Sequence, residues 1–399
     1  MPVRYKYSSI LILLLVFPAL AIGARLVYGF ELFWLLSLVY LSGEDFKSNK
    51  NANLIFILIV IAVALILLTQ LIFWGYPHGT SILRVLFNLS PIFFMSKIFK
   101  NDSVYPKFEL ILYYISILAL LQFIDGYILK NLIGINKLIG FLYPYSGSLD
   151  DAELELSGGA NIAVSSYNSA TSIADGHSIL LGDLLAVFSI VPLVRGKLFL
   201  YFLSFLATLI TFSRGSWLMF VIGFIAYIFL YRKEIPKKFY IKTFSVVILS
   251  FILMFFIQPI YEAFFFRIAN TLFAFGLIDL EIGSQFDGRT AIVWPMFFSE
   301  FNKNGIMAYL FGYNYIGPTD SGFLVILRDL GLMGFGIYFL FFIWTTYKSK
   351  FDNVIILLNI VLITGLFFHP ISQGNRLLFG YAILVSARLS QLGYNKTLN

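Results

Sequence analysis

The chain has 399 residues, of which 59% are hydrophobic and 12% charged, and it has no cysteine. Soluble domains carry about 25% charged residues, so this composition and a mean hydropathy of +0.87 predict an all-α membrane protein and exclude disulfides, thiol chemistry and cysteine-ligated zinc. The net charge of +7 does not indicate nucleic acid as a partner, because the cations lie mainly in short connections between apolar runs.

Apolar runs of about 18–20 residues recur along the chain, and each is long enough to cross a hydrocarbon core of about 30 Å. We therefore predict one polytopic membrane domain over residues 1–399, with about twelve transmembrane helices. We expect the first run to remain in the bilayer and not to act as a cleaved signal peptide, because another span follows it directly. The predicted spans are 8–25, 28–43, 53–73, 80–98, 108–124, 177–194, 198–213, 215–231, 239–258, 321–346, 353–369 and 376–393.

Lysine and arginine are unevenly distributed between the connections, and this bias predicts that both termini are cytoplasmic. The opposite, outer side receives two long connections, residues 125–176 and 259–320. Its cations are mainly arginine, whereas the inner ones are mainly lysine. Lysine suffices as a topology signal, but paired binding of oxyanions favours arginine. We therefore expect the outer face to carry the chemistry.

Residues 211–218 place Arg214 between two apolar runs. A cation at membrane depth is costly and is retained where it faces a cavity, a partner or a ligand. The N-terminal N–H groups of the following helix also favour an anion. The pattern predicts an anion site at the outer end of two spans. An interface arginine whose guanidinium reaches water is an equally weighted alternative.

For four further residues on the outer side, an anion-binding or catalytic role is also weighed against a structural one. Arg84 lies about one turn inside its span, where an ion pair with Asp183 or another buried acid is the favoured interpretation. Arg328 lies about two turns inside span 321–346, and an internal salt bridge is favoured for it. Arg376 opens the last span from outside, as Arg214 opens its own. His369 lies in the turn before that span, where histidines are more often structural than catalytic.

The second half of the chain carries an ordered set of motifs. Residues 212–218 read Phe-Ser-Arg-Gly-Ser-Trp-Leu, and Gly288, Arg289 and Trp294 form a Gly-Arg-x4-Trp element. A Gly-x-Asn turn follows at 312–314, and 328–334 reads Arg-Asp-Leu-Gly-Leu-Met-Gly. In this order the motifs resemble the O-antigen polymerase (Wzy) and O-antigen ligase superfamily over roughly residues 198–346.

The two branches of that superfamily differ in the motif that enters span 321–346. Ligases typically have His-Asn there, with the histidine proposed as catalytic, whereas this chain has Asp320-Ser321. The resemblance therefore favours a polymerase of O-antigen, capsule or a related surface polysaccharide. A ligase that transfers glycan to lipid A core is one alternative. A transporter or flippase is another, although no internal repeat is visible and the arginines gather toward one face.

The resemblance implies a GT-C-like, metal-independent, inverting glycosyltransferase in the bacterial cytoplasmic membrane, active on the periplasmic or extracellular face. Its partners would be undecaprenyl-diphosphate-linked glycan donor and acceptor and the lipid bilayer, with a chain-length regulator as a candidate and no cofactor. Cations should stabilise the departing diphosphate. The expected catalytic residues are Arg214, Arg289 and Asp320, the last as a base with Glu281, Asp287 and His369 as rivals. A mechanism without a protein base is also open. The candidate substrate-binding residues are Arg84, Arg376, Arg328, Tyr313 and His369.

Overall fold

The computed structural model describes residues 10, 12–17, 20–22, 25–41, 50–77, 81–94, 104–129, 132–135, 138, 178–211, 213–236, 239, 245, 294–313, 315, 321–369 and 375–395. Their regular structure is helical except for a hairpin of two short strands, β1 (Leu20–Ile22) and β2 (Arg25–Val27). Two compact units are distinguished. Unit 1 comprises Met1–Leu20, Val27–Phe108 and Ile292–Asn399, and unit 2 comprises Ala21–Leu26 and Glu109–Ala291.

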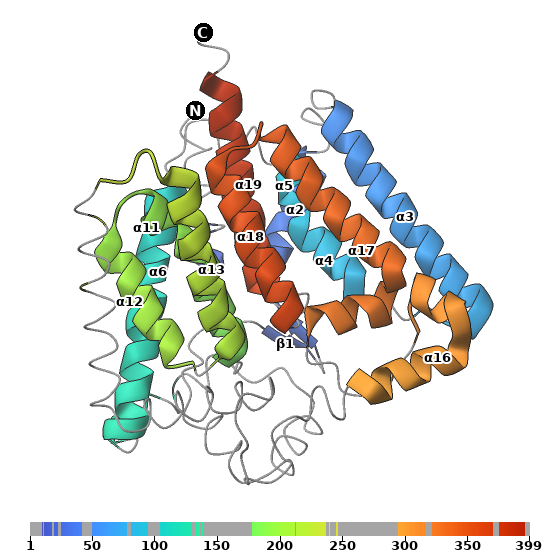
Figure 1. Ribbon diagram of the computed structural model, residues 1–399, viewed down its shortest axis with the longest axis horizontal. Helices are drawn as coiled ribbons and strands as arrows, with labels where there is room; N and C mark the ends of the chain where they lie inside the picture. The colour runs from blue at the N-terminus through green and yellow to red at the C-terminus, as the bar shows by residue number, and fades with distance from the viewer. Residues whose placement is uncertain are drawn as a thin grey trace. The chain divides into compact units, whose positions relative to one another are not determined.

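Unit 1 is a layered set of helices (Figure 1). Helix α17 packs against α16, α18 and α3, while α19 packs against α18 and the broken pair α4 and α5. The bounds are α2 (Gly29–Leu41), α3 (Lys50–Trp74), α4 (Ser81–Leu89), α5 (Pro91–Phe94), α16 (Trp294–Phe311), α17 (Gly322–Lys348), α18 (Asn353–Phe368) and α19 (Asn375–Asn395).

Unit 2 contains most of α6 and a group of helices in which α10 contacts both α12 and α13. Helix α6 ends in a π-helical turn, and the buried carboxylate of Asp125 in that turn accepts hydrogen bonds from the N–H groups of Ile133 and Ile135. The bounds are α6 (Val104–Phe123), η2 (Ile124–Ile128), α10 (Ser178–Phe188), α11 (Ile190–Val194), α12 (Leu198–Leu209) and α13 (Arg214–Tyr231).

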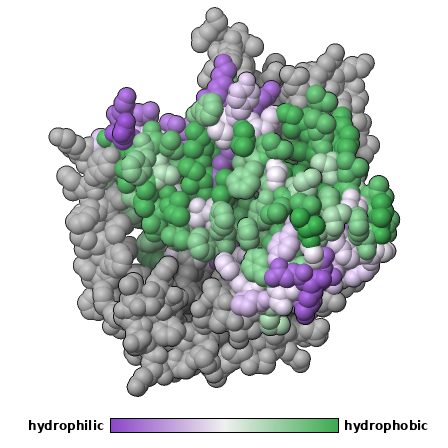
Figure 2. Space-filling model, turned by 45° about the vertical axis from the view of Figure 1, so that its right-hand side comes forward, coloured by the Kyte–Doolittle hydropathy of each residue, from purple (hydrophilic) through white to green (hydrophobic). Residues whose placement is uncertain are grey.

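Three helices within the described ranges are long and apolar enough to cross a membrane: Leu54–Trp74, Val104–Gly126 and Gly322–Lys348. Shorter apolar helices accompany them. Figure 2 shows apolar side chains over α3 and α17, and Leu65, Leu68 and Ile72 of α3 are all more than half exposed. In water such a surface would be unfavourable. Unit 1 therefore presents the kind of helix surface that an α-helical membrane protein turns to lipid.

Polar side chains join the helices of unit 1 inside this apolar environment. The amide of Asn359 on α18 donates to the Thr345 and Thr346 hydroxyls of α17 and accepts from the Tyr381 hydroxyl of α19. On α19, the Ser386 hydroxyl donates to the Pro91 carbonyl. Hydrogen bonds between membrane helices each contribute about 0.6–2 kcal/mol. These contacts fix the register of α17, α18 and α19.

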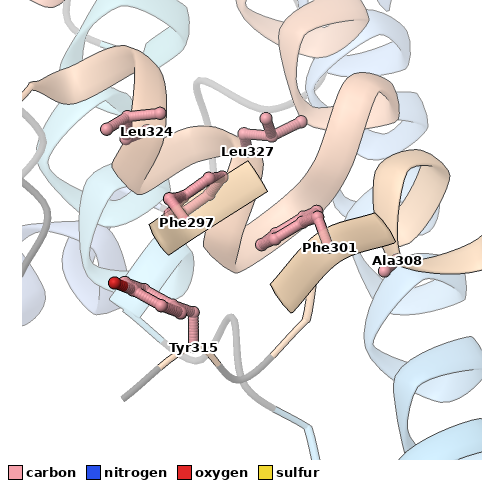
Figure 3. Close-up of a cluster of buried hydrophobic side chains, with 6 residues drawn as sticks. All are labelled: Phe297, Phe301, Ala308, Tyr315, Leu324 and Leu327. Carbon is pink, nitrogen blue, oxygen red and sulfur yellow. The ribbon is translucent and has the colours of Figure 1, made fainter. Parts of the chain in front are cut away.

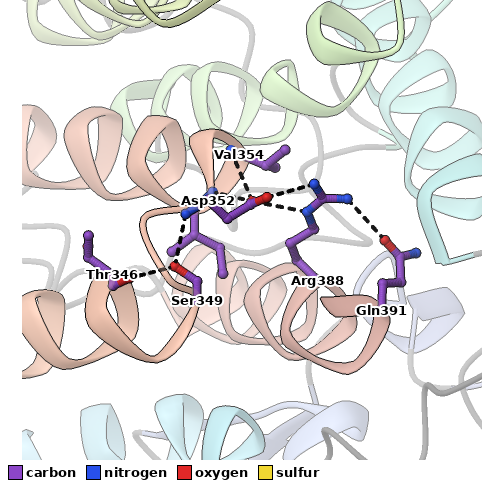
Figure 4. Close-up of polar contacts among 7 residues, drawn as sticks. Thr346, Ser349, Asp352, Val354, Arg388 and Gln391 are labelled. Atoms are coloured by element: carbon purple, nitrogen blue, oxygen red, sulfur yellow. Dashed lines mark hydrogen bonds and ion pairs between the residues drawn. The ribbon is translucent and has the colours of Figure 1, made fainter. Parts of the chain in front are cut away.

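The turn between α17 and α18 is held by one carboxylate (Figure 4). Asp352 caps α18 by accepting from the N–H groups of Val354 and Ile355. The same carboxylate pairs with the Arg388 guanidinium of α19, at 3.0 Å to Nε and 2.6 Å to Nη2. Such paired contacts are geometrically specific. The Asp352 carboxylate therefore joins α18 to α19 at the end of the unit for which the lysine distribution predicts a cytoplasmic location.

Several predicted spans differ from the observed elements. Span 8–25 is wrong as a continuous helix, because residues 12–14 are helical but Leu20–Ile22 form a strand. The sequence has a proline at position 18, and proline cannot continue a helical hydrogen-bond ladder. Spans 80–98 and 177–194 are interrupted at Ser90 and Ser189, each of which returns its hydroxyl to a carbonyl of the preceding turn. Span 239–258 lies almost entirely outside the described residues.

Candidate functional site

The start of α13 is built by small polar residues. Ser213 is the N-cap, and its side chain accepts from the N–H of Ser216 at 3.4 Å. The Ser216 hydroxyl donates at 2.7 Å to the buried carboxylate of Asp183 on α10 and is also 2.7 Å from the Ser213 hydroxyl. The Trp217 indole donates to the Thr208 carbonyl of α12. This network places Arg214 as the first residue of α13.

Helix α10 approaches this network very closely. A Cβ atom on Gly182 would lie 2.5 Å from the Ser216 Oγ and 2.9 Å from the Thr211 Oγ1. Only glycine leaves room for α13 at this distance. Sequence reasoning did not assign Gly182, and it considered Asp183 only as a partner for Arg84. The signal that was available is the pairing of a glycine and an acid in an apolar run, which typically marks close helix packing around a polar contact.

The side chains of the three predicted catalytic residues lie outside the described part of the structure. The structure describes the backbone position of Arg214 but not its side chain, and Arg289 and Asp320 lie outside the described residues, as do Glu281 and Asp287. Their roles therefore remain predictions. Within the described ranges, no group of three or more His, Cys, Asp or Glu residues is arranged to hold a metal ion.

The start of α17 lies beside the end of α18. Ser321 is the N-cap of α17, because its side chain accepts from the N–H of Leu324 at 3.2 Å. The N–H of Gly322 donates to the His369 carbonyl at 2.7 Å. A Cβ on Gly322 would lie 2.6 Å from that carbonyl oxygen and 2.8 Å from the Leu366 carbonyl oxygen. Ser321 is therefore the residue that caps α17, and His369 lies beside Gly322.

The predicted glycine turn and the Arg-Asp motif meet where α16 and α17 touch. Gly312, with φ +83°, and Gly331, with φ +64°, let the two backbones approach so closely that a Cβ at either would be within 2.5 Å of the other segment. Because Gly331 is non-helical, α17 is kinked there. The N–H of Tyr313 donates to the Arg328 carbonyl at 2.9 Å. Gln70 of α3, which is fully buried, donates to the carbonyls of Phe311 and Asp329 at 2.6 and 2.7 Å.

Arg328 forms an ion pair with the neighbouring Asp329, with Nε 2.7 Å from Oδ1. The internal salt bridge favoured from sequence is therefore confirmed, and its partner is the acid of the same motif. Gln70 was missed, because nothing local in α3 indicates that its side chain faces a kink formed by residues more than 200 positions later.

Aromatic residues of α16 pack beneath this kink (Figure 3). The rings of Phe297 and Phe301 stack with centroids 4.4 Å apart, and Tyr315 meets Phe297 edge-on at 5.0 Å. Tyr313 is half-buried and contacts Phe301 and Trp74. Burial, and to a smaller extent the charge of Glu300, raises the pKa of the Tyr315 hydroxyl above 10.0. Tyr315 therefore stays neutral at physiological pH and serves as packing in this cluster.

Arg84 and Arg376 come together around Tyr28. Arg84 pairs with both carboxylate oxygens of Glu31 on α2, at 2.8 and 2.7 Å. The two guanidinium carbons lie 5.2 Å (Arg84) and 4.8 Å (Arg376) from the centre of the Tyr28 ring. Arg376, the second residue of α19, is buried and donates to the carbonyls at positions 15 and 17. The ion pair expected for Arg84 is confirmed, and its acid is Glu31.

Asn88 completes the group around these arginines. Its amide nitrogen lies 2.9 Å from the Asn375 side-chain oxygen and 3.4 Å from the Glu31 carboxylate. The group, formed by Tyr28, Glu31, Arg84, Asn88, Asn375 and Arg376, joins α2, α4 and α19 and holds the N-terminal segment through the carbonyls that Arg376 contacts. The group contains one carboxylate and two guanidinium groups, of which Arg84 pairs with the carboxylate, so its members carry a net positive charge.

The sequence comparisons agree with the motifs. Residues 199–339 match the family model described as O-antigen ligase. This segment contains nearly all of α12, then α13, α16 and the first part of α17. It includes Arg214 and the kink at Gly331, but not Gly182 and Asp183 of α10. No curated protein is significantly similar to the chain. The match therefore supports the resemblance to the O-antigen polymerase and ligase superfamily over residues 199–339.

Proposed function

We propose that the protein is a polysaccharide polymerase, which joins oligosaccharide repeat units carried on undecaprenyl diphosphate into O-antigen or a related surface polysaccharide. The observation that carries the proposal is the position of Arg214 as the first residue of α13, inside the segment that matches the family model. First-turn N–H groups and a guanidinium at the same helix end favour a bound diphosphate.

The reaction follows from the substrates. A hydroxyl oxygen of the acceptor sugar attacks the anomeric carbon of the donor glycan, and the bond from that carbon to the diphosphate oxygen breaks. Undecaprenyl diphosphate leaves with the bonding electron pair, and attack from the opposite face inverts the anomeric configuration. Negative charge grows on the diphosphate as the bond breaks. Arg214 and Arg289 are assigned to stabilise it, because preorganised cations lower the energy of such a transition state without a metal ion.

The hydroxyl of the acceptor sugar loses its proton during the attack, and we assign the Asp320 carboxylate as the base that accepts this proton. Support comes from its place in the sequence directly before Ser321, whose capping role leaves Asp320 available for chemistry. The backbone contact between Gly322 and His369 makes His369 the nearest rival among the described residues. Glu281 and Asp287 remain rivals on sequence order alone.

The other predicted binding residues take supporting roles in this proposal. Arg84 and Arg376 contribute positive potential from the group around Tyr28, in which their guanidinium groups already contact protein atoms. Arg328 and Tyr313 hold the connection between α16 and α17, which carries the Gly312 turn. We assign direct contact with the diphosphate to Arg214 and Arg289.

The site belongs, in this proposal, on the outer face of a bacterial cytoplasmic membrane, with both termini in the cytoplasm. The chain forms one membrane domain with a GT-C-like fold, and residues 125–176 and 259–320 lie outside, the latter including α16. Lipid-linked donor and acceptor reach the site from the bilayer. A chain-length regulator protein is assigned as an interaction partner on the basis of the superfamily.

A second candidate function is supported by the description of the matching family, which is O-antigen ligase. A ligase would use the same donor and the same leaving group but would transfer the glycan to lipid A core. The Asp320-Ser321 pair, in place of the His-Asn of the ligase branch, favours the polymerase. The two functions consume different acceptors, and that difference decides between them.

The proposal is tested by glycan display in a strain that lacks the gene. A polymerase deletion should abolish the ladder of polymer lengths and leave a single repeat unit attached to its final acceptor, and the gene supplied in trans should restore the ladder. A ligase deletion should instead leave no glycan on lipid A core while polymer accumulates on its lipid carrier. That second result would overturn the polymerase and support the ligase.

A further inference from the structure

An apolar groove runs between α17 and α18. Its α17 wall includes Phe335, Phe339 and Phe342, and its α18 wall includes Ile363, Leu366 and Phe367. The spacings of three and four residues place each set on one face of its helix. Every described residue that lines the groove has an aliphatic or aromatic side chain. Among these residues no charged group is present to bind a polar ligand.

The groove opens on the surface of a helix that is long and apolar enough to cross a membrane. Phe339 is 49% exposed and Phe367 is 53% exposed, whereas Leu366 and Tyr338 in the same lining are buried. In a bilayer the solvent at such an opening is hydrocarbon, and a water-soluble ligand could not reach it. In such a setting the groove suits the hydrocarbon chain of a lipid.

One end of the groove reaches the start of α17. Phe323 lines the groove and directly follows Gly322, whose N–H donates to the His369 carbonyl. Leu366 also lines it and lies against Gly322. A chain in the groove thus has one end at the start of α17, beside Gly322 and the His369 carbonyl. A lipid headgroup attached to that end would lie near Ser321, the residue that follows Asp320 in the sequence.

We propose that this groove holds the isoprenoid chain of the lipid carrier of the substrate, an inference that rests on the proposed polymerase or ligase activity. Phe323 lies between Phe335, at 4.7 Å, and Phe367, at 6.3 Å, so that aromatic rings form a continuous wall. Methyl branches and double bonds every few atoms give an isoprenoid chain more side contacts with such rings than a straight acyl chain has.

A further feature favours an isoprenoid chain over a phospholipid chain. A branched, unsaturated chain has fewer conformations to lose when it is held in one groove.

The test of binding uses neighbouring positions of α17 that differ in their relation to the groove. A photoreactive benzoylphenylalanine replaces either Phe339, in the groove, or Leu340, which is 64% exposed and does not line it. The full-length protein is reconstituted in phosphatidylglycerol vesicles that contain undecaprenyl phosphate as a minor component, and adducts are identified by mass spectrometry.

We expect the ratio of undecaprenyl to phospholipid adducts to be at least about tenfold higher at position 339 than at 340, which corresponds to about 1.4 kcal/mol of preference. Equal ratios at the two positions, matching the vesicle composition, would mean that the groove holds bulk lipid and would overturn the proposal. This measurement needs no catalytic turnover, so it can succeed even if the polymerase and ligase assignments both fail.

A second test fills the groove. Ile363→Trp places an indole in it, and Ile356→Trp is the matched control, because Ile356 is also half-buried and lies on the same helix face two turns away, outside the groove. We expect Ile363→Trp to raise KM for the lipid-linked substrate about tenfold with kcat nearly unchanged, and Ile356→Trp to change neither. An unchanged KM in folded Ile363→Trp would contradict the proposal.

Discussion

Arg214 begins α13, but the residues around it determine where that helix starts. Ser213 caps the helix, and Ser216 joins the cap to Asp183. An anion bound at this position would be favoured by two features, the N–H groups of the helix end and the paired donors of the arginine. The placement was predictable from the residues at 211–218, whereas the contact with Asp183 was not, because sequence spacing does not reveal which acid meets which helix.

At Arg214 we predict that Arg214→Lys loses most polymerising activity while the protein inserts normally. Lysine keeps the positive charge but lacks the planar pair of donors for a diphosphate, and loss of one stabilising group in a transition state typically costs about 10²–10³ in rate. Polymer length and amount are measured at matched protein level. Arg195→Lys is the control, because Arg195 pairs with Glu109 away from the site. A full ladder from Arg214→Lys would reduce Arg214 to an interface residue.

At Asp320 we predict that Asp320→Asn lowers the rate by orders of magnitude with little change in thermal stability, because asparagine cannot accept the acceptor proton. Ser321→Ala is the matched variant with the opposite expectation. It removes the cap of α17 and should cost about 1 kcal/mol of stability while activity per folded molecule is kept. Near-normal turnover of Asp320→Asn would remove Asp320 as the base and point to His369, Glu281, Asp287 or a mechanism without a protein base.

At the scale of elements, the apolar runs predicted the helices of the second half well. Helices α12, α13, α17, α18 and α19 begin within one residue of the predicted spans. The sequence did not indicate the kink at Gly331 as such, because glycines at this spacing are equally compatible with close packing of a straight helix. Its cause is the approach of the Gly312 turn. Helix α16 lies in a stretch that sequence reasoning treated only as a long outer connection.

The contact between α10 and α13 gives a prediction about packing. Gly182→Ala should destabilise the protein by about 1–3 kcal/mol, because its Cβ would lie 2.7 Å from the Ser216 Cβ and force the two helices apart. Thermal unfolding in detergent measures the change. The comparison is Gly336→Ala on α17, where a Cβ meets open space and alanine should be neutral or slightly stabilising. Equal unfolding temperatures for the two variants would show that α10 does not hold the start of α13.

The kink in α17 gives a prediction about Gln70. Gln70→Leu keeps the approximate size of the side chain but removes the donors to the Phe311 and Asp329 carbonyls. Unsatisfied buried groups cost about 1–3 kcal/mol each, so we expect a clearly lower unfolding temperature. Thr69→Val is the control, because the Thr69 hydroxyl donates to a carbonyl of its own helix. If the two variants unfold alike, Gln70 does not support the kink.

At the scale of the whole molecule, composition was enough to predict a helical membrane protein, and the ordered motifs were enough to predict the superfamily that residues 199–339 match. The partners of individual charges were not predictable. Arg84 meets Glu31, which lies 53 positions away on another helix, and only folding brings them together. Composition likewise could not predict the β1–β2 hairpin, because its apolar residues satisfy the helix pattern equally well.

The distribution of cations gives a prediction about topology. A reporter enzyme fused after Lys233 should be active only in the cytoplasm, and one fused near Gly283 only outside, because lysine and arginine concentrate in cytoplasmic connections. Paired reporters, one active on each side of the membrane, measure both positions. The reverse pattern would place Arg289 and Asp320 in the cytoplasm and remove the proposed outer active face.

Reconstitution of the purified protein with one chemically defined substrate tests the central claim most directly. Proteoliposomes receive an undecaprenyl-diphosphate-linked repeat unit together with lipid A core, and the products are separated by length and by carrier. The account predicts glycans of two or more repeats on undecaprenyl diphosphate, one released undecaprenyl diphosphate for each bond formed, and unmodified lipid A core. Transfer of single repeats to lipid A core, with no elongation on the lipid carrier, would contradict it.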